Sequence, residues 1–287
     1  MNKIICADVL DGLKQIPDNY ASLMITSPPY SVGILYDNYN DNMNYFEYLK
    51  WLKNVFLECK RTLRVGGRFA INMATITNRQ EDKDKEYIRI LGKYLGNMME
   101  EIGMLPFAEI IWSKQDAAGK KTAWGSFTSS SCPIIRSTHE FIYVFSKEQF
   151  RLDGDSELSD MTPEEFNEYT FSTWSIQPET SRNIDHPVPF PIELVKRIIK
   201  LYSYRGDVVL DPFNGSGTTC LTAYLLGRQY IGIDNSKKYC DFAENRIREA
   251  KINIEMQLDQ EVYIPRSVRL KNHKSKDNVE MKDLFED

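Results

Sequence analysis

The hydrophobic pattern of the chain consists of short apolar runs separated by longer amphipathic segments. Seven runs are nearly continuous in Ile, Val, Leu and Phe, which is typical of strands buried on both faces of a parallel sheet. These runs are Lys3–Cys6, Ser22–Ile25, Arg68–Met73, Glu109–Trp112, Phe141–Phe145, Val208–Leu210 and Tyr230–Ile233. The pattern therefore predicts seven strands.

Four of the intervening segments repeat apolar residues every three or four positions, which predicts amphipathic helices. These segments are Tyr45–Leu63, Glu86–Ile102, Ile192–Tyr202 and Lys237–Ala250. Gly66-Gly67 and Gly103 follow the first two and predict where those helices end. Strands that alternate with helices are typical of a doubly wound α/β sheet. We therefore expect a seven-stranded Rossmann-like fold.

Two long segments interrupt this alternation. Lys114–Ser137 is rich in Gly, Ser, Thr and Lys, whereas Glu148–Asp185 is polar and acidic, with a short helix predicted to begin at Thr162-Pro163. Loops of this length inside a domain are usually functional or disordered. The chain beyond Met256 has little apolar content and predicts a loosely held appendage. We expect one domain over residues 1–255, with inserted regions at about 113–137 and 148–185, followed by an appendage over residues 256–287.

Composition narrows the class of protein further. The 287 residues are 42% hydrophobic and 27% charged, as in ordinary globular proteins, and the N-terminal sequence lacks the pattern of a secretion signal. Five widely spaced cysteines and three histidines suggest reduced thiols in the cytoplasm and no metal site. A net charge of −5 argues against a general nucleic-acid coat protein but allows a local basic surface on a DNA enzyme.

A glycine-rich turn after the strand Val208–Leu210 is the first candidate site. Its residues are Asp211, Pro212, Phe213, Asn214, Gly215, Ser216 and Gly217. Glycines at a strand-to-helix turn allow close approach of a ligand and expose N–H groups at the helix start. The next predicted strand ends at Asp234, beside Asn235, at the spacing typical of a ribose-binding carboxylate. The pattern favours a nucleoside-containing cofactor over a tight turn with a surface aspartate, and the missing P-loop lysine disfavours a nucleoside triphosphate.

The second candidate site follows the strand Ser22–Ile25. Its residues are Ser27, Pro28, Pro29 and Tyr30. Prolines cannot continue a sheet, but they hold carbonyl oxygens in a fixed direction. An exocyclic amino group on a base is a weak nucleophile, and acceptance of its hydrogens by Ser27 and the Pro28 carbonyl would localise its lone pair. Tyr30 could stack on a flipped base, although a proline-rich turn with a packed tyrosine is an equal alternative on these residues alone.

Together, these motifs resemble the amino-methyltransferases of DNA over nearly the whole chain to about Ala250. The catalytic SPPY precedes the cofactor motif DPFxGSGTT, an order similar to the β-type permutation of that family. Further segments resemble the family in matching order: Cys6-Ala7-Asp8, Arg61–Gly67, His139–Lys147 and His186–Pro191. The family implies S-adenosylmethionine as cofactor and double-stranded DNA as substrate.

The resemblance also assigns roles to residues. Ser27, Pro28 and Tyr30 would hold the target amino group, the turn at Asp211 would line the methionine part of the cofactor, and Asp234 would bind the ribose. Asp8 would lie near the adenine, and the segment containing His186 and Pro187 would close over the cofactor; His186 as a general base is the alternative. The family order implies that both inserted regions take part in DNA recognition, with sequence recognition at about Glu148–Asp185. That stretch is acidic, so the Lys114–Arg136 loop is the better candidate for DNA contacts, through Lys120, Lys121, Trp124 and Arg136.

Two positions of the resemblance bear on which base is methylated. Within the family, Ser at the first catalytic position and Phe at the position of Phe190 are typical of cytosine-N4 enzymes. We therefore expect N4-methylation of a flipped cytosine, with adenine-N6 methylation as the nearest alternative. A non-catalytic DNA-binding protein and a non-DNA amino-methyltransferase also remain open. A cognate restriction endonuclease and a homodimer are partners that the resemblance suggests and the residues do not specify.

Overall fold

The structure of the chain is a computed structural model. It describes residues 2–30, 44–74, 76–82, 85–114, 125–133, 135, 137–179 and 190–262, with backbone alone for residues 76–89 and 255–262. The chain forms two compact units, Met1–Ile247 and Arg248–Asp287. The architecture below is that of the first unit.

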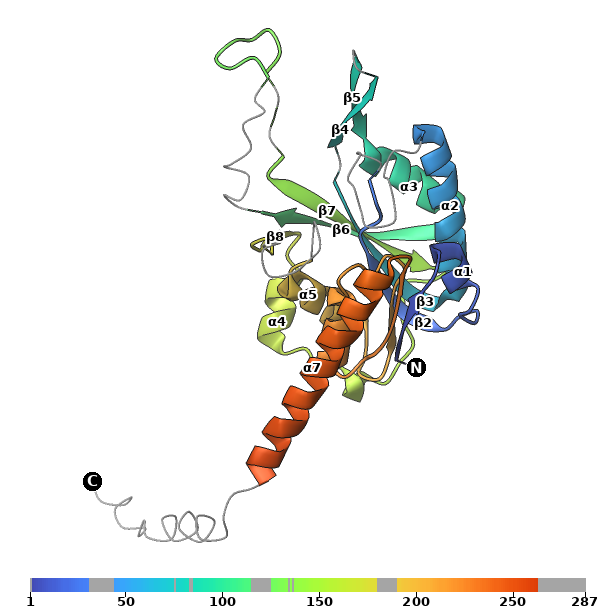
Figure 1. The fold of residues 1–287 in the computed structure, drawn as a ribbon, viewed down its shortest axis with the longest axis vertical. Helices are drawn as coiled ribbons and strands as arrows, with labels where there is room; N and C mark the ends of the chain where they lie inside the picture. The colour runs from blue at the N-terminus through green and yellow to red at the C-terminus, as the bar shows by residue number, and fades with distance from the viewer. Residues whose placement is uncertain are drawn as a thin grey trace, which may run out of the picture. The chain divides into compact units, whose positions relative to one another are not determined.

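An eight-stranded sheet forms the centre of this unit, in the order β1-β10-β9-β2-β3-β7-β6-β8 (Figure 1). Its strands are β1 (Lys3–Cys6), β2 (Ala21–Thr26), β3 (Leu63–Met73), β6 (Met104–Ser113), β7 (His139–Lys147), β8 (Thr173–Ser175), β9 (Val208–Asp211) and β10 (Gln229–Asp234). Strand β7 is antiparallel to both neighbours, and the other pairs are parallel. All seven predicted strands lie in this sheet, but the predicted number was wrong because β8 adds an eighth.

Helices cover the two faces of the sheet. They are α1 (Val9–Leu13), α2 (Tyr45–Thr62), α3 (Leu91–Glu101), α4 (Pro163–Tyr169), α5 (Ile192–Tyr202), α6 (Thr218–Leu225) and α7 (Lys237–Val262). Apolar residues of α1, α2 and α3 share one core with the strands, and α2 and α3 lie side by side in Figure 1. Helices α5 and α6 pack together elsewhere on the sheet. Coverage of both faces explains the continuous apolar runs in the sequence.

Three predicted helix boundaries were wrong. The helix predicted to end at Ala250 is α7, which runs to Val262. The first turn of the helix predicted at Glu86–Ile102 is instead strand β5 (Lys85–Ile90), which pairs with β4 (Ile76–Asp82) in an antiparallel hairpin. A hairpin ladder satisfies the backbone of this stretch, and its β-branched residues suit a strand. Gly66-Gly67 does not end α2 either, because the chain enters β3 directly at Leu63. Gly66 is required for another reason: its φ is +73°, and a Cβ there would lie 2.0 Å from the Arg151 carbonyl oxygen.

The acidic segment around α4 has a structural explanation. Thr162 caps α4 as predicted, in a capping box with Glu165. Glu165 also binds Lys200 of α5 at 2.6 Å, and Glu168 binds Arg197 of the same helix. Acidic residues of α4 and basic residues of α5 therefore pair with each other within the chain.

Two further observations concern the helices and the cysteines of the described residues. Within the described ranges, no helix has the length and apolar content needed to cross a bilayer. Cys59, Cys220 and Cys240 are buried, whereas Cys6 and Cys132 are exposed, and none forms a disulfide in the described structure.

Candidate active site

The two candidate motifs meet where the winding of the sheet reverses. Strands β2 and β9 are parallel neighbours, and the chain runs outward from them in opposite directions across the sheet. Ser27 follows β2 and Asp211 ends β9, so both lie at the carboxyl edge of the sheet. The hydroxyl of Thr26 donates to Asp211 Oδ1 at 2.9 Å and links the two motifs directly. Ligands of doubly wound folds bind outside this edge, at the point of reversal.

Asp211 lies beneath the turn instead of facing its surface. Its side chain is 2% exposed, and it accepts hydrogen bonds from Thr26, from the Thr219 hydroxyl at 2.7 Å and from the Phe213 N–H at 3.0 Å. Burial raises the pKa of Asp211 from 3.8 to about 6, against these hydrogen bonds, and the charge of Asp234 adds to the rise. Asp211 is therefore placed to hold the turn in shape, although the sequence predicted direct contact with the cofactor.

The raised pKa of Asp211 predicts a pH-dependent effect of Asp211→Asn. Because the folded-state pKa lies above 3.8, the stability linked to protonated Asp211 is fully present below about pH 4 and is lost as pH rises through about 6. The variant has no carboxyl group to ionise. Its free energy of unfolding should therefore rise relative to wild type by ~2–3 kcal/mol between pH 4 and pH 8. Urea denaturation of both proteins across this range measures the difference, and a constant difference would contradict the assignment.

The glycine-rich turn uses its own N–H groups to maintain its shape. The N–H groups of Asn214 and Gly217 donate to the carbonyls of Ile233 and Asn214, both at 2.9 Å. Gly217 begins α6 with φ +78°, and a Cβ there would lie 2.5 Å from the Ala243 Cβ. The N–H groups of Asn214 and Gly217 are thus used within the turn and at the end of β10, and glycine at 217 serves conformation and packing.

The acidic residues at the ends of β1 and β10 lie on adjacent strands. Asp234 accepts from the Gly215 N–H at 2.8 Å and from the Ser236 N–H at 2.9 Å, which ties β10 to the turn. Asp8 is exposed and caps α1 by accepting from the Leu10 N–H at 2.9 Å. Carboxylates only accept hydrogen bonds, which suits both groups chemically to ribose hydroxyls or an adenine amino group.

Sequence analysis missed a residue that supports the turn from behind. Arg246 of α7 donates to the Ser216 carbonyl at 2.7 Å and to the Thr218 hydroxyl at 3.1 Å. Asn214 packs over β10, where a Cβ on Gly232 would lie 2.5 Å from its side chain. Neither amide atom of Asn214 has a hydrogen-bond partner among the described residues. No local sequence pattern marks Arg246, because α7 carries many polar residues.

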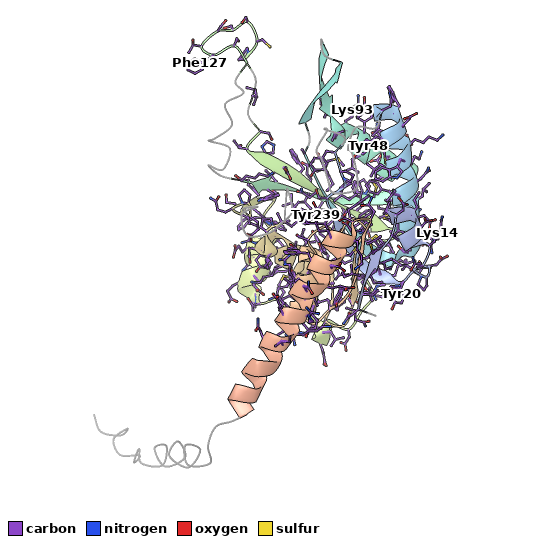
Figure 2. All side chains as sticks on the ribbon, viewed as in Figure 1. Lys14, Tyr20, Tyr48, Lys93, Phe127 and Tyr239 are labelled. Atoms are coloured by element: carbon purple, nitrogen blue, oxygen red, sulfur yellow. The ribbon has the colours of Figure 1, made fainter. Side chains whose placement is uncertain are left out.

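The catalytic motif is held from two sides. The Ser27 hydroxyl and the Tyr30 hydroxyl are hydrogen-bonded at 2.9 Å, and Pro28 is buried. Tyr48 of α2, labelled in Figure 2, donates to the Pro29 carbonyl at 2.8 Å. Trp51, one turn later, lies 5.8 Å from the ring of Phe213 in the glycine-rich turn. Helix α2 therefore contacts both motifs, which the apolar spacing that predicted the helix could not reveal.

The segment expected to form the far wall of the base pocket adjoins Tyr30. Asn72 of β3 donates from Nδ2 to Tyr30 Oη at 3.2 Å and to Glu140 Oε2 of β7 at 2.7 Å. Glu140 in turn forms an ion pair with Lys114. The predicted wall is thus next to the catalytic motif, while Asn72 and Lys114 were not singled out from the sequence.

Six predicted site residues lie outside the described residues. They are His186 and Pro187 of the closing segment, and Lys120, Lys121, Trp124 and Arg136 of the DNA-contacting loop. Residues 125–133, between Trp124 and Arg136 in the sequence, form a turn. Its Phe127, labelled in Figure 2, is 68% exposed.

Comparison with known proteins identifies the class. Residues 21–245 match the N6_N4_Mtase family, described as DNA methylase, and the chain therefore belongs to this family. The Type II methyltransferase M.MjaVI of Methanocaldococcus jannaschii is 34% identical over 170 residues, which are 59% of this chain and 84% of that protein. M.BglII of Bacillus subtilis, also a Type II methyltransferase, is 28% identical over 255 residues, which cover 85% of this chain and 68% of that protein.

Solved structures share the fold. TTHA0409 of Thermus thermophilus, in complex with S-adenosyl-L-methionine, has a TM-score of 0.69 and 25% identity, covering 87% of this chain and 95% of that one. PvuII DNA methyltransferase, which is cytosine-N4-specific, has a TM-score of 0.65, 20% identity and 86% coverage of both chains; it shows the shared fold alone. The chain is a DNA methyltransferase that depends on S-adenosylmethionine.

The residues at this edge suit that cofactor chemically. The carboxylates of Asp8 and Asp234 are acceptors that suit hydroxyl and amino donors. The aromatic pair of Trp51 and Phe213 supplies an apolar wall beside the turn. When bound, the cofactor supplies a methyl group on an electrophilic sulfonium.

Proposed function

We propose that this DNA methyltransferase methylates the exocyclic N4 amino group of a cytosine flipped out of the duplex. The observation that carries the proposal is the position of the Ser27 hydroxyl, at the carboxyl end of β2 and one strand from the cofactor turn. The Ser27 hydroxyl is a neutral acceptor, and the resemblance of the SPPY motif to cytosine-N4 enzymes supports cytosine over adenine. The adenine-N6 reaction uses the same geometry and is the alternative.

The proposed chemistry is direct methyl transfer. Ser27 Oγ and the Pro28 carbonyl accept the two amino hydrogens, which localises the nitrogen lone pair. A nitrogen–carbon bond forms as the carbon–sulfur bond breaks, and the amino nitrogen then releases one proton. Tyr48 fixes the carbonyl of the neighbouring Pro29 and so helps to orient the motif. No covalent enzyme intermediate is involved.

The proposal extends to the organisation and the partners of the enzyme. The order of the motifs supports a β-type permutation, with the catalytic domain over residues 1–255 and an appendage over residues 256–287. The loop containing Lys120, Lys121, Trp124 and Arg136 is proposed to contact DNA. The Type II names of the relatives support a restriction-modification role with a cognate endonuclease. A homodimer and a cytoplasmic location complete this hypothesis.

Analysis of methylated nucleosides tests the proposal. Plasmid DNA is incubated with the purified protein and isotopically labelled S-adenosylmethionine, digested to nucleosides and analysed by mass spectrometry. Labelled N4-methylcytosine is expected. Labelled N6-methyladenine would overturn the assignment of the base but keep the family chemistry. No label in either base, with cofactor bound and DNA of varied sequence supplied, would overturn the proposed activity.

A further inference from the structure

The Tyr30 hydroxyl occupies a small polar site between two strands. It lies 2.9 Å from Ser27 Oγ, donates to the Asn72 backbone carbonyl at 3.2 Å and accepts from Asn72 Nδ2 at 3.2 Å. Asn72 is only 3% exposed and lies near the carboxyl end of β3, beside β2. Besides Tyr30, this site therefore contains the Ser27 hydroxyl, a carbonyl acceptor and one directed N–H donor.

Glu140 fixes which side of the Asn72 amide faces this site. A carboxylate only accepts hydrogen bonds, so the 2.7 Å contact of Glu140 requires the nitrogen side of the amide. The second hydrogen of Nδ2 then points at Tyr30 Oη. Lys114 neutralises Glu140 and lies 4.7 Å from the ring centre of Trp112, while the Glu140 side chain is 13% exposed. Glu140, held by Lys114, therefore fixes the orientation of the Asn72 side-chain amide.

This orientation leaves a polar atom unsatisfied. Asn72 Oδ1 is buried and has no hydrogen-bond partner among the residues that the structure describes. An unpaired buried acceptor is destabilising, and such groups in a native fold need an explanation. Packing alone would favour an arrangement that pairs both ends of the amide. The locked N–H donor beside Ser27 suggests a functional reason.

We propose that Asn72 reads the ring nitrogen next to the target amino group, with Tyr30 Oη holding that place until the base enters. When a flipped base displaces this hydroxyl, Ser27 accepts from the amino group and Asn72 Nδ2 donates to the adjacent unprotonated nitrogen. That nitrogen is N3 in cytosine and N1 in adenine. Thymine and guanine carry N–H groups at the corresponding positions and would oppose the donor. The inference rests on the proposed function and deepens it: Asn72 selects the aminopyrimidine edge, and Glu140 is its positioning residue.

A substitution in the base tests this role directly. The methylated site from the nucleoside analysis is placed in two duplexes, one natural and one with the ring nitrogen of the target base replaced by C–H, such as 3-deazacytosine. Wild type should lose about 10²-fold or more in kcat/KM on the deaza duplex, because the donor is left unpaired. Asn72→Leu should be about 10-fold to 10²-fold slower than wild type on natural DNA, yet the ratio between its two duplexes should fall close to one.

Glu140→Gln provides a second variant that keeps Asn72. A neutral amide at position 140 can donate as well as accept, so Asn72 is no longer locked and the ratio between the duplexes should fall below that of wild type. Binding of S-adenosylmethionine by each variant confirms folding. A ratio in both variants equal to that of wild type would overturn the role of Asn72. Failure of wild type to methylate natural DNA would instead overturn the proposed function on which this role depends.

Discussion

Replacement of Ser27 by alanine is expected to lower kcat for methyl transfer by about 10²–10³-fold, the effect of removing one preorganised hydrogen-bonding group from a transition state. The reason is electronic: without the Ser27 acceptor, the amino lone pair stays delocalised into the ring of the base. The Ser27 hydroxyl is hydrogen-bonded to Tyr30, whereas the carboxylates of Asp8 and Asp234 accept from N–H groups of other turns. Affinity for S-adenosylmethionine should therefore be unchanged, and single-turnover kinetics with labelled cofactor measure the chemical step apart from binding.

Two further substitutions make this prediction specific. Ser175→Ala removes a hydroxyl from the exposed end of β8, outside the hydrogen-bond network, and should leave kcat unchanged. Ser27→Asp replaces the hydroxyl by another acceptor and should recover part of the activity lost in Ser27→Ala. If Ser27→Ala were as active as wild type, localisation of the lone pair by Ser27 would be wrong, even if the methylated base were the predicted one.

The parts of the fold that were predictable from the sequence are those with a strong periodic signal. Buried strands such as β2, and helices such as α2 and α5, follow from apolar spacing because each must bury a continuous face or stripe. Strand β8 has three residues, of which only Trp174 is buried, so it leaves no periodic pattern. Strand β5 was mistaken for helix because its apolar spacing also fits the start of α3.

The candidate site also contains residues that the sequence predicted and residues that it did not. The motifs beginning at Ser27 and Asp211 were found because proline pairs and glycine turns have few structural uses and occur directly after strands. The residues that support them, Asn72, Tyr48 and Arg246, come from other elements and act through single contacts across the fold. Such contacts depend on tertiary packing, which a local pattern does not contain. The burial of Asp211 could not be foreseen either, because the residue ends an apolar strand and equally suits a ligand or the core.

The same limit applies to the ion pair of Arg228 with Asp160, whose disruption should have the largest effect on stability. The Arg228 side chain is fully buried and donates to both Asp160 oxygens, at 2.6 and 2.8 Å. It also donates to the carbonyls of Ser203 and Leu226, at 2.8 and 2.7 Å. Burial alone would raise the pKa of Asp160, but the hydrogen bonds and charge of Arg228 outweigh it and keep that pKa below its ordinary value.

Arg228→Met should therefore lower the free energy of unfolding by ~3–5 kcal/mol, because it removes the buried donor from the Asp160 carboxylate and from two carbonyls. Arg205→Met is the matched control: Arg205 lies 3.6 Å from the same Asp160, but its side chain is 64% exposed. Its loss should change stability by less than ~1 kcal/mol. Urea denaturation at pH 7 compares the two variants.

The double variant Arg228→Met with Asp160→Leu separates the pair from its surroundings. Removal of both charges avoids the uncompensated carboxylate, so this protein should be more stable than Arg228→Met alone. The carbonyls of Ser203 and Leu226 would still lack their donor, which should keep it less stable than wild type. If Arg228→Met and Arg205→Met destabilised the protein equally, the buried pair would not be the contact that holds the acidic segment to the sheet.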